Sequence, residues 1–449
     1  MTKAIRSAEL LGALSHALDL TEGQPQGHCI RACWIGTHLG KAINLGPAEL
    51  SELYYTLLLK DLGCSSNAAR ICQLYLTDDR QFKADFKLID GSLSQALRFV
   101  LSHTGLQSGM AERFRAVVNI VKNGGEISRE LIDARCNRGA DIARQMGFSE
   151  QVANAIQHLD EHWDGRGKPE GISARKIPTA AQIALLAQVA DVFHTAAGKD
   201  AAIREIENRA GTWFAPDLVD VFVALADWDG LWEPLTSPQL KSHVLGLEPP
   251  ENIRLSSEDD LDRVAQGFAM VIDSKSPFTR GHSDRVALFT DVIAEELGQS
   301  PQHRRWLRRA ALLHDIGKLA ISNTILDKPA KLTDDEFAVV KTHPSHSAAI
   351  LKDVAAFADM ADIAGHHHER LDGKGYPHGL KDDQISFDTR IVTTADVFDA
   401  LTADRPYRKA MTPLEAFVIM DKDLGTAFDP MCLTALKSAL HRLQLAEAA

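Results

Sequence analysis

The chain has 449 residues, enough for two or three domains with separate hydrophobic cores. Its formal net charge of −12 argues against a nucleic-acid polymer as the main partner. No apolar run reaches the roughly 18 residues that a membrane span requires, and residues 1–20 lack the apolar block of a signal peptide. We therefore expect a cytoplasmic protein without a membrane segment, in which an anionic ligand would need a local cationic site.

Helical periodicity dominates the sequence. Apolar residues recur at i, i+3, i+4 and i+7 through most of the chain, and strand-like alternation is scarce. This pattern predicts an all-α protein. The six cysteines include no CxxC pair and fit no zinc-ribbon spacing, so we expect them to be buried free thiols.

Four segments of the first half recur in the same order in the second half. They share a Gly-His pair, an apolar run that ends in Asp-x-Gly, an Asp-Gly-x-Gly-x-Pro turn and an Ala-Asp-Val-Phe segment. The matched segments are residues 27–31 with 281–285, 57–63 with 311–317, 161–169 with 369–377, and 190–193 with 395–398. The repeat predicts two copies of one helical unit, with extra residues in the first copy roughly between Leu76 and Glu130.

A segment rich in proline separates the two copies. Prolines between Trp228 and Glu258 would interrupt helices, so this region is the predicted connection. We divide the chain into a first domain at residues 1–235, a linker at 236–255 and a second domain at 256–449. Cap residues and first-turn acids predict a new helix from near Ser256 to about Asp273.

The first copy lacks several side chains that could bind a metal ion in the second. The replacements are Lys60 for His314, Arg135 or Cys136 near the position of His343, and Leu159 and Asp160 for His367 and His368. An ammonium group at Lys60 would repel a metal ion and could pair with Asp61. We expect a metal-free first domain with a regulatory or structural role.

The second copy combines imidazoles and carboxylates in a pattern typical of metal sites. His314 and Asp315 end an apolar run with helical spacing, so we expect both on a buried helix, where a divalent ion would offset the cost of burying them. The candidate ligands are His282, His314, Asp315, His343, His367, His368 and Asp396. This set exceeds the needs of one ion, so we expect two ions bridged by Asp315. Nitrogen and oxygen ligands suit Fe, Mn, Ni or Zn.

Four other side chains could contact a phosphate group. Lys318, three residues after Asp315, is expected to be a catalytic cation, with a surface lysine as the alternative. Tyr376 lies in the Asp-Gly-x-Gly-x-Pro turn, which could line the site or serve only as a connector. Arg405 and Arg408 offer bidentate phosphate binding, with a solvated charged face as the alternative.

Residues 256–449 resemble an HD-GYP domain, a branch of the HD phosphohydrolases. The resemblance rests on residues 279–283, the run His314-Asp315-Ile316-Gly317-Lys318, His343-Pro344, residues 367–377 and residues 395–402. The first copy resembles a degenerate HD-GYP unit that has lost its ligands. The resemblance implies tandem HD-like helical domains, of which the second is catalytic.

The resemblance also implies a site and an activity. In the family a His pair directly precedes the Glu, so His367 and His368 are the implied ligands and His366 is extra. Trinuclear members carry a Glu four residues before the first His, where this chain has Phe278, so a two-metal centre is implied. By matching position, the resemblance implies that the seven candidate ligands bind metal and that Lys318, Arg405 and Arg408 face phosphates. We expect Asp315 and Lys318 to be the catalytic residues.

The activity that the resemblance implies is hydrolysis of cyclic di-GMP to pGpG, GMP or both. Metal ions and Arg side chains contact phosphates and not base edges, so a 3′,3′-cyclic GMP-AMP phosphodiesterase is an open alternative. A non-catalytic cyclic-dinucleotide sensor and a general HD nucleotidase are two further functions to weigh, although the second copy has lost none of its ligands. A homodimer is compatible with the sequence.

Overall fold

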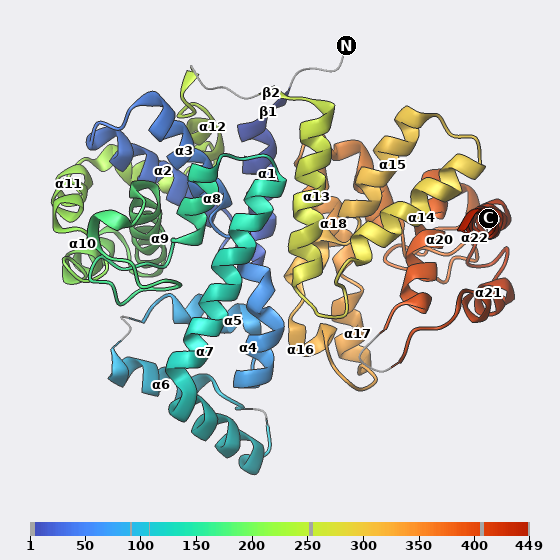
Figure 1. Cartoon of the computed structure of the whole chain (residues 1–449), viewed down its shortest axis with the longest axis horizontal. Helices are drawn as coiled ribbons and strands as arrows, with labels where there is room; N and C mark the ends of the chain where they lie inside the picture. The colour runs from blue at the N-terminus through green and yellow to red at the C-terminus, as the bar shows by residue number, and fades with distance from the viewer. Residues whose placement is uncertain (1–4, 90–91, 107, 251–254, 405–407, 448–449) are drawn as a thin grey trace. The chain divides into compact units, whose positions relative to one another are not determined.

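The chain divides into two compact helical units in this computed structural model, which describes residues 5–89, 92–106, 108–250, 255–404 and 408–447 (Figure 1). The units are Met1–Arg263 and Val264–Ala449. The helical content confirms the predicted all-α class. Within the described ranges the strands are two-residue segments, β1 (Ile5–Arg6) and β2 (Leu255–Ser256), which pair antiparallel. None of the described helices is long and apolar enough to cross a membrane.

The described helical elements follow one another in a similar order in the two units. In the first unit they are α1 (Ser7–Thr21), α2 (His28–Ala42), α3 (Pro47–Leu59), η1 (Cys64–Asn67), α4 (Ala68–Tyr75), α5 (Asp79–Phe86), α6 (Leu93–His103), α7 (Met110–Gln145), α8 (Glu150–Gln157), η2 (Ala174–Lys176), α9 (Thr179–Ala197), α10 (Lys199–Asn208), α11 (Pro216–Ala226), η3 (Asp229–Leu231), η4 (Glu233–Thr236) and α12 (Leu240–Leu245). Helix α13 (Glu258–Ser274) leads into the second unit, which continues with α14 (His282–Glu296), α15 (Pro301–Leu313), η6 (Ile316–Ala320), α16 (Asn323–Leu326), α17 (Asp334–Val340), α18 (His343–Lys352), η7 (Ala358–Met360), α19 (Ala361–His366), η8 (Asp382–Gln384), α20 (Phe387–Thr402), α21 (Pro413–Lys422) and α22 (Pro430–Glu447).

The predicted repeat is visible in the local backbone geometry. Helices α2 and α14 each begin at a histidine that follows a left-handed glycine, Gly27 with φ 91° and Gly281 with φ 69°. A left-handed residue is tolerated best by glycine, because glycine has no Cβ. The same turn therefore places His28 and His282 at equivalent positions in the two units.

The Asp-Gly-x-Gly-x-Pro turns are held in the same way in both units. The buried carboxylate of Glu161 accepts hydrogen bonds from the backbone N–H groups of Glu170 and Gly171 at 2.6 and 3.0 Å. Glu369 accepts from His378 and Gly379 at 2.6 and 3.1 Å. A buried glutamate fixes each loop because it satisfies backbone donors that would otherwise be left unpaired.

The extra residues of the first unit form α5, α6 and the N-terminal part of α7, the long helix beside α6 in Figure 1. Together with α4 they build a small hydrophobic core. Its buried members are Ile71, Leu74, Tyr75, Phe82, Phe99, Ile120, Ile127 and Leu131. The insertion therefore packs against α4 of the first unit.

Two local features of the backbone differ from the sequence-based expectations. Part of the expected linker, residues 240–245, folds as α12 with Leu240 and Val244 buried. Helix α15 ends at Leu313, so His314 and Asp315 lie in the turn that follows the helix and not on it. Adjacent residues on a helix point about 100° apart, whereas this turn lets both side chains face the interior.

The sequence alignment of the fourth repeated segment was wrong by three residues. His28 Nδ1 contacts Asp191 Oδ2 at 2.6 Å, and Arg31 Nε donates to Asp191 Oδ1. In the second unit, His282 and Arg285 make the same bonds to Asp399 and not to Asp396. The equivalent of Asp191 is therefore Asp399, and the residue that stands in the place of Asp396 is Gln188.

Close backbone packing at Gly63 generates the first prediction. A Cβ at Gly63 would lie 1.8 Å from the carbonyl oxygen of Arg135, whereas one at Gly124, in α7, would meet nothing within 4 Å. We expect Gly63→Ala to destabilise the chain by about 1–3 kcal/mol, because the two backbones must separate. The control Gly124→Ala should be neutral or stabilising by up to about 1 kcal/mol, because alanine favours the helix. Urea unfolding midpoints measure both, and equal midpoints would contradict the close approach.

Candidate metal centre

Five elements of the second unit bring the seven predicted ligands together. His282 begins α14, His343 begins α18, and Asp396 lies in α20. His314 and Asp315 follow α15, while His367 and His368 follow α19. Six of the seven residues are buried, and His368 is half-buried. Ligands that are distant in sequence thus converge in one interior cluster.

The carboxylate of Asp315 lies between two groups of imidazoles. Its Oδ2 is 3.4 Å from His282 Nε2 and 3.3 Å from His314 Nε2. Its Oδ1 is 3.3 Å from His343 Nε2 and 3.7 Å from His367 Nε2. Each oxygen therefore faces a different pair of ring nitrogens, the arrangement expected of a carboxylate that bridges two ions.

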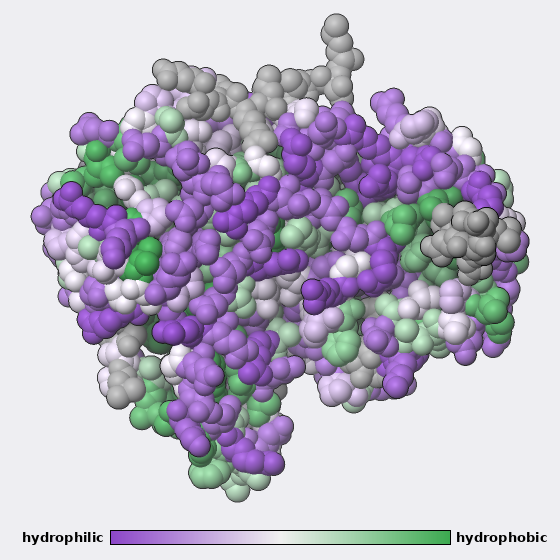
Figure 2. All heavy atoms as spheres, in the orientation of Figure 1, coloured by the Kyte–Doolittle hydropathy of each residue, from purple (hydrophilic) through white to green (hydrophobic). Residues whose placement is uncertain are grey.

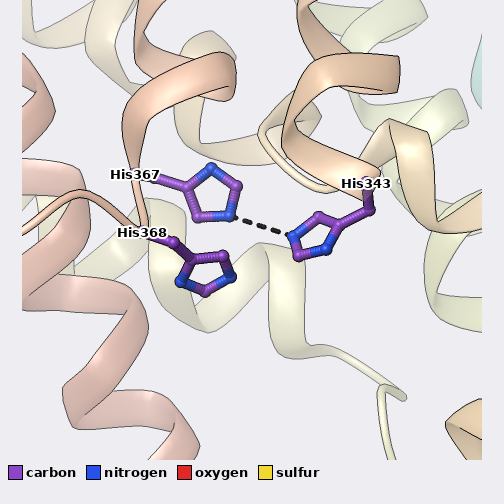
Figure 3. Close-up of side chains that lie close together, drawn as sticks. All are labelled: His343, His367 and His368. Atoms are coloured by element: carbon purple, nitrogen blue, oxygen red, sulfur yellow. Dashed lines mark hydrogen bonds between the residues drawn. The ribbon is translucent and has the colours of Figure 1, made fainter. Parts of the chain in front are cut away.

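Asp396 completes the first group. Its Oδ1 is 3.4 Å from His282 Nε2 and 3.8 Å from His314 Nε2. The second group contains His343, His367 and His368, whose rings face one another across the ends of α18 and α19 (Figure 3). His343 and His367 approach to 3.4 Å between their Nε2 atoms.

Hydrogen bonds on the outer ring nitrogens orient these imidazoles. Nδ1 of His314, His343 and His367 contacts the carbonyl oxygens of Ala311, Val340 and Ala364 at 2.6, 2.7 and 2.8 Å. Each carbonyl belongs to the last turn of a helix, where it has no partner within the helix. Because Nδ1 donates outward, the lone pair of Nε2 points into the cluster, as metal ligation requires.

Asp399 is a candidate site residue that sequence reasoning missed. It accepts from His282 Nδ1 at 2.7 Å and from Arg285 Nε at 2.5 Å. It thus orients the first ligand from outside the cluster. The sequence did contain this information. The offset that aligns the two Asp-Gly-x-Gly-x-Pro turns, residues 161–169 with 369–377, also aligns Asp191 with Asp399.

The carboxylates of the cluster favour positive charge on the neighbouring histidines. Burial opposes protonation of His282, but Asp315, Asp396 and Asp399 raise its pKa to about 10. Burial also opposes protonation of His314, but Asp315 and Asp396 raise its pKa to about 9. Burial and the neighbouring imidazoles lower the pKa of His367 to about 4. Without a metal ion, two protonated imidazoles thus offset the charge of the carboxylates.

The cluster fits a divalent metal ion. Nε2 of His282, Nε2 of His314 and Oδ1 of Asp315 are buried and have no hydrogen-bond partner in the described part of the chain. Leaving such atoms unpaired is costly, and a cation between them would satisfy all three. Imidazole nitrogen and carboxylate oxygen are common ligands of Zn, Fe, Mn and Ni.

The predicted phosphate-contacting residues differ in their surroundings. The Lys318 ammonium, half-buried, forms an ion pair with Asp315 Oδ2. The ring of Tyr376 lies 4.8 Å from that of His368, so the turn does border the cluster. Arg408 donates to the carbonyl oxygens of Ala400 and Leu401 at 2.6 and 2.8 Å. Arg405 lies outside the described residues.

The corresponding place in the first unit contains ammonium and guanidinium groups. Lys60 Nζ lies 2.9 Å from His28 Nε2 and 3.0 Å from Gln188 Oε1, and it forms an ion pair with Asp61. Lys60 thus pairs with Asp61, as expected, and its ammonium contacts the equivalents of His282, Asp315 and Asp396.

The backbone also settles which residue replaces His343. Gly63 packs on the carbonyl of Arg135, as Gly317 packs on that of His343. Arg135 therefore stands in the place of His343, and it pairs with Asp160, which stands in the place of His368.

Comparison with known proteins identifies the family. The model of the HD domain family matches residues 109–218 and 266–432, one segment in each unit. The chain therefore belongs to the HD domain family, and the expected HD-GYP resemblance is confirmed.

Relatives that match the whole chain are more specific. The 3′3′-cGAMP-specific phosphodiesterase 3 of Vibrio cholerae is 49% identical over 437 residues, which are 97% of this chain and 95% of that protein. A crystal structure of a cyclic GMP-AMP-specific phosphodiesterase of V. cholerae matches with a TM-score of 0.66 and 44% identity, covering 98% of both chains.

Cyclic di-GMP enzymes match a smaller part of the chain. A cyclic di-GMP phosphodiesterase response regulator of Xanthomonas campestris is 38% identical over 211 residues, 46% of this chain and 56% of that protein. The expectation that cyclic di-GMP is the substrate was wrong, because the relatives similar over the full length are specific for cyclic GMP-AMP. The general reaction class, phosphodiester hydrolysis of cyclic dinucleotides, is supported by all three relatives.

We expect metal binding near neutral pH to release protons. With pKa values of about 10 and about 9, His282 and His314 are protonated at pH 7 in the metal-free chain. Both must become neutral to bind an ion, so the apparent metal affinity should rise as the pH is raised. Calorimetric titration of the chelated protein with Mn²⁺ in two buffers of different ionisation enthalpy measures the release. A binding heat independent of the buffer would contradict these protonation states.

Proposed function

We propose that the second unit is a metal-dependent phosphodiesterase that hydrolyses 3′,3′-cyclic GMP-AMP. The observation that carries this proposal is the position of Asp315, with one carboxylate oxygen toward His282 and His314 and the other toward His343 and His367. This geometry supports a binuclear centre. The substrate is supported by the specificity of the relatives that match along the whole chain.

Two ions would be held by two ligand groups. His282, His314, Asp315 and Asp396 would hold one ion, and Asp315, His343, His367 and His368 the other. When bound, the ions would supply Lewis acidity toward a phosphoryl oxygen and a lowered pKa for the attacking water.

The protein's own side chains position and neutralise the substrate. Lys318 places its ammonium beside Asp315, where it would offset negative charge on a phosphate oxygen in the transition state. Tyr376 and Phe337, with ring centroids 6.2 Å apart, present aromatic surface next to His368. That surface suits a purine base, because bases stack on aromatic rings.

A hollow of about 360 Å³ lies beside Asp399, the residue that accepts a hydrogen bond from His282. Arg280, Arg285, Asp399 and Asp404 line it together with Phe278 and Thr402. Arg285 is paired with Asp399, so Arg280 is the guanidinium that could contact a phosphate of the dinucleotide there. Arg405 and Arg408 remain proposed phosphate contacts.

Turnover of three substrates tests the proposal. The purified chain supplied with Mn²⁺ should hydrolyse 3′,3′-cyclic GMP-AMP with a kcat/KM at least about tenfold above that for cyclic di-GMP, a difference of about 1.4 kcal/mol in transition-state binding. Bis-p-nitrophenyl phosphate, which lacks both bases, should be slower still. Equal or faster turnover of bis-p-nitrophenyl phosphate would indicate a general phosphodiesterase.

Substitution of the proposed bridging carboxylate gives another prediction. Asp315→Ala should reduce hydrolysis by at least about a hundredfold and remove most of the bound metal, because one carboxylate serves both ions. The matched control Asp353→Ala alters an exposed aspartate at the end of α18 and should change neither quantity. Full metal content with retained turnover in Asp315→Ala would refute the assignment.

Metal stoichiometry gives a further prediction. Phe278 cannot donate to an ion, and Lys60 fills the equivalent place in the first unit. We therefore expect about two ions per active chain. Elemental analysis of the purified protein measures the count, and three or more ions per active chain would contradict either the role of Phe278 or the metal-free first unit.

A further inference from the structure

The first unit contains a cavity of about 970 Å³, at the upper end of the usual range of small-molecule pockets, about 300–1,000 Å³. Its walls come from α4 to α7, from α9 and from the Asp-Gly-x-Gly-x-Pro turn at residues 164–169. The insertion found only in the first unit thus encloses space over the body of the repeat. No described residue of the second unit lines it.

The cavity opens onto the positions that correspond to the metal ligands of the second unit. Arg135, Asp160 and Gln188 line it, and they stand in the places of His343, His368 and Asp396. The repeat therefore puts the cavity where the second unit would hold its substrate.

The cavity is locally cationic in a chain of net charge −12. Seven lysine or arginine and four aspartate or glutamate side chains line it. Each of the four acidic side chains forms an ion pair with a lysine or arginine of the same lining: Glu22 with Lys87, Asp160 with Arg135, Asp164 with Arg166, and Glu205 with Arg209. The excess of positive charge would concentrate an anionic ligand.

Lys168 and Lys122 supply positive charge that no described ion pair neutralises, although the carboxylates of Asp133 and Glu161 lie near Lys168. Neither ammonium has a hydrogen bond or ion pair to another described residue, and Lys168 is half-buried in the place that Tyr376 occupies in the second unit. Burial and the nearby Arg129 lower the pKa of Lys168. A phosphate beside it would offset that cost.

The opposite wall is apolar. Phe86, Leu97 and Val121 line the cavity and expose 44%, 44% and 58% of their surface. Figure 2 shows hydrophobic side chains among hydrophilic ones at the end formed by α6 and α7, with further hydrophobic patches elsewhere on this face. A ligand with both a phosphate and a flat apolar base would fit such a cavity.

We propose that this cavity binds a cyclic dinucleotide without hydrolysing it. The chemical class rests on the proposed function, because the cavity repeats the location of that substrate site. Lys60 replaces His314 and Arg135 replaces His343, so cations stand where the second unit has metal ligands, and hydrolysis by the same chemistry is excluded. The first unit is thus a binding site for the substrate class of the second unit.

Binding stoichiometry in the full-length, metal-loaded chain tests this proposal. The probe is a phosphorothioate analogue of 3′,3′-cyclic GMP-AMP that resists hydrolysis, followed by isothermal titration calorimetry. The unsubstituted chain should bind two molecules. Lys168→Glu should weaken one site at least about tenfold, because an attractive charge becomes repulsive, and Lys122→Glu, an exposed change on α7, should weaken the same site.

Control variants separate the two sites. Lys176→Glu makes the same charge change at an exposed lysine of the first unit outside the cavity, and it should leave both sites intact. Asp315→Ala should remove the other site while keeping the one that depends on Lys168. Lys168→Glu should retain hydrolytic turnover.

The outcomes distinguish this inference from the proposed function. A single site that is lost in Asp315→Ala and unaffected by Lys168→Glu and Lys122→Glu overturns the inference and leaves the proposed function standing. A site that depends on Lys168, in a chain that hydrolyses no cyclic dinucleotide, supports the inference and refutes the proposed function. Inorganic phosphate that binds as tightly as the analogue would overturn the assignment to a dinucleotide.

Discussion

Buried carboxylates require compensating positive charge, and each unit is arranged around that requirement. Asp315 and Asp396 are buried at the centre of the second unit, and Asp61 is buried at the centre of the first. Moving a carboxylate from water to a protein interior without a partner is strongly unfavourable. The second unit surrounds these carboxylates with imidazoles that could hold a divalent ion, whereas the first unit places the Lys60 ammonium directly against Asp61.

The two ways of compensating the buried carboxylates have different chemical consequences. In the second unit, Lys318 pairs with Asp315 Oδ2, but the inward Nε2 atoms of His282 and His314 and Oδ1 of Asp315 have no hydrogen-bond partner in the described part of the chain, which leaves a place for an added cation. In the first unit, the Lys60 ammonium lies among His28, Asp61 and Gln188, so the interior is already compensated. The Arg135 and Asp160 pair does the same at the neighbouring position. The fold persists in both units while only one retains an unsatisfied cluster.

Much of the fold and of the candidate site could be predicted from the sequence. The all-α class follows from helical periodicity, and the candidate histidine ligands follow from the His and Asp motifs of the second copy. The exact position of Asp315 in a turn could not be predicted, because apolar spacing continues up to Leu313 and does not mark where the helix ends. Asp399 was missed because Ala-Asp-Val-Phe matched a segment three residues away, nearly one helical turn, where the apolar pattern is the same. The identity of the purines could not be predicted, because metal ligands and basic side chains contact phosphates and not bases.

The central claim is that metal ions occupy the second unit and that ammonium and guanidinium groups replace them in the first. Anomalous diffraction from crystals of the full-length chain grown with Mn²⁺ tests it most directly. We expect two peaks, one on each side of the Asp315 carboxylate, and none beside Lys60. A peak between His28 and Asp61, or a single peak not in contact with Asp315, would contradict this claim.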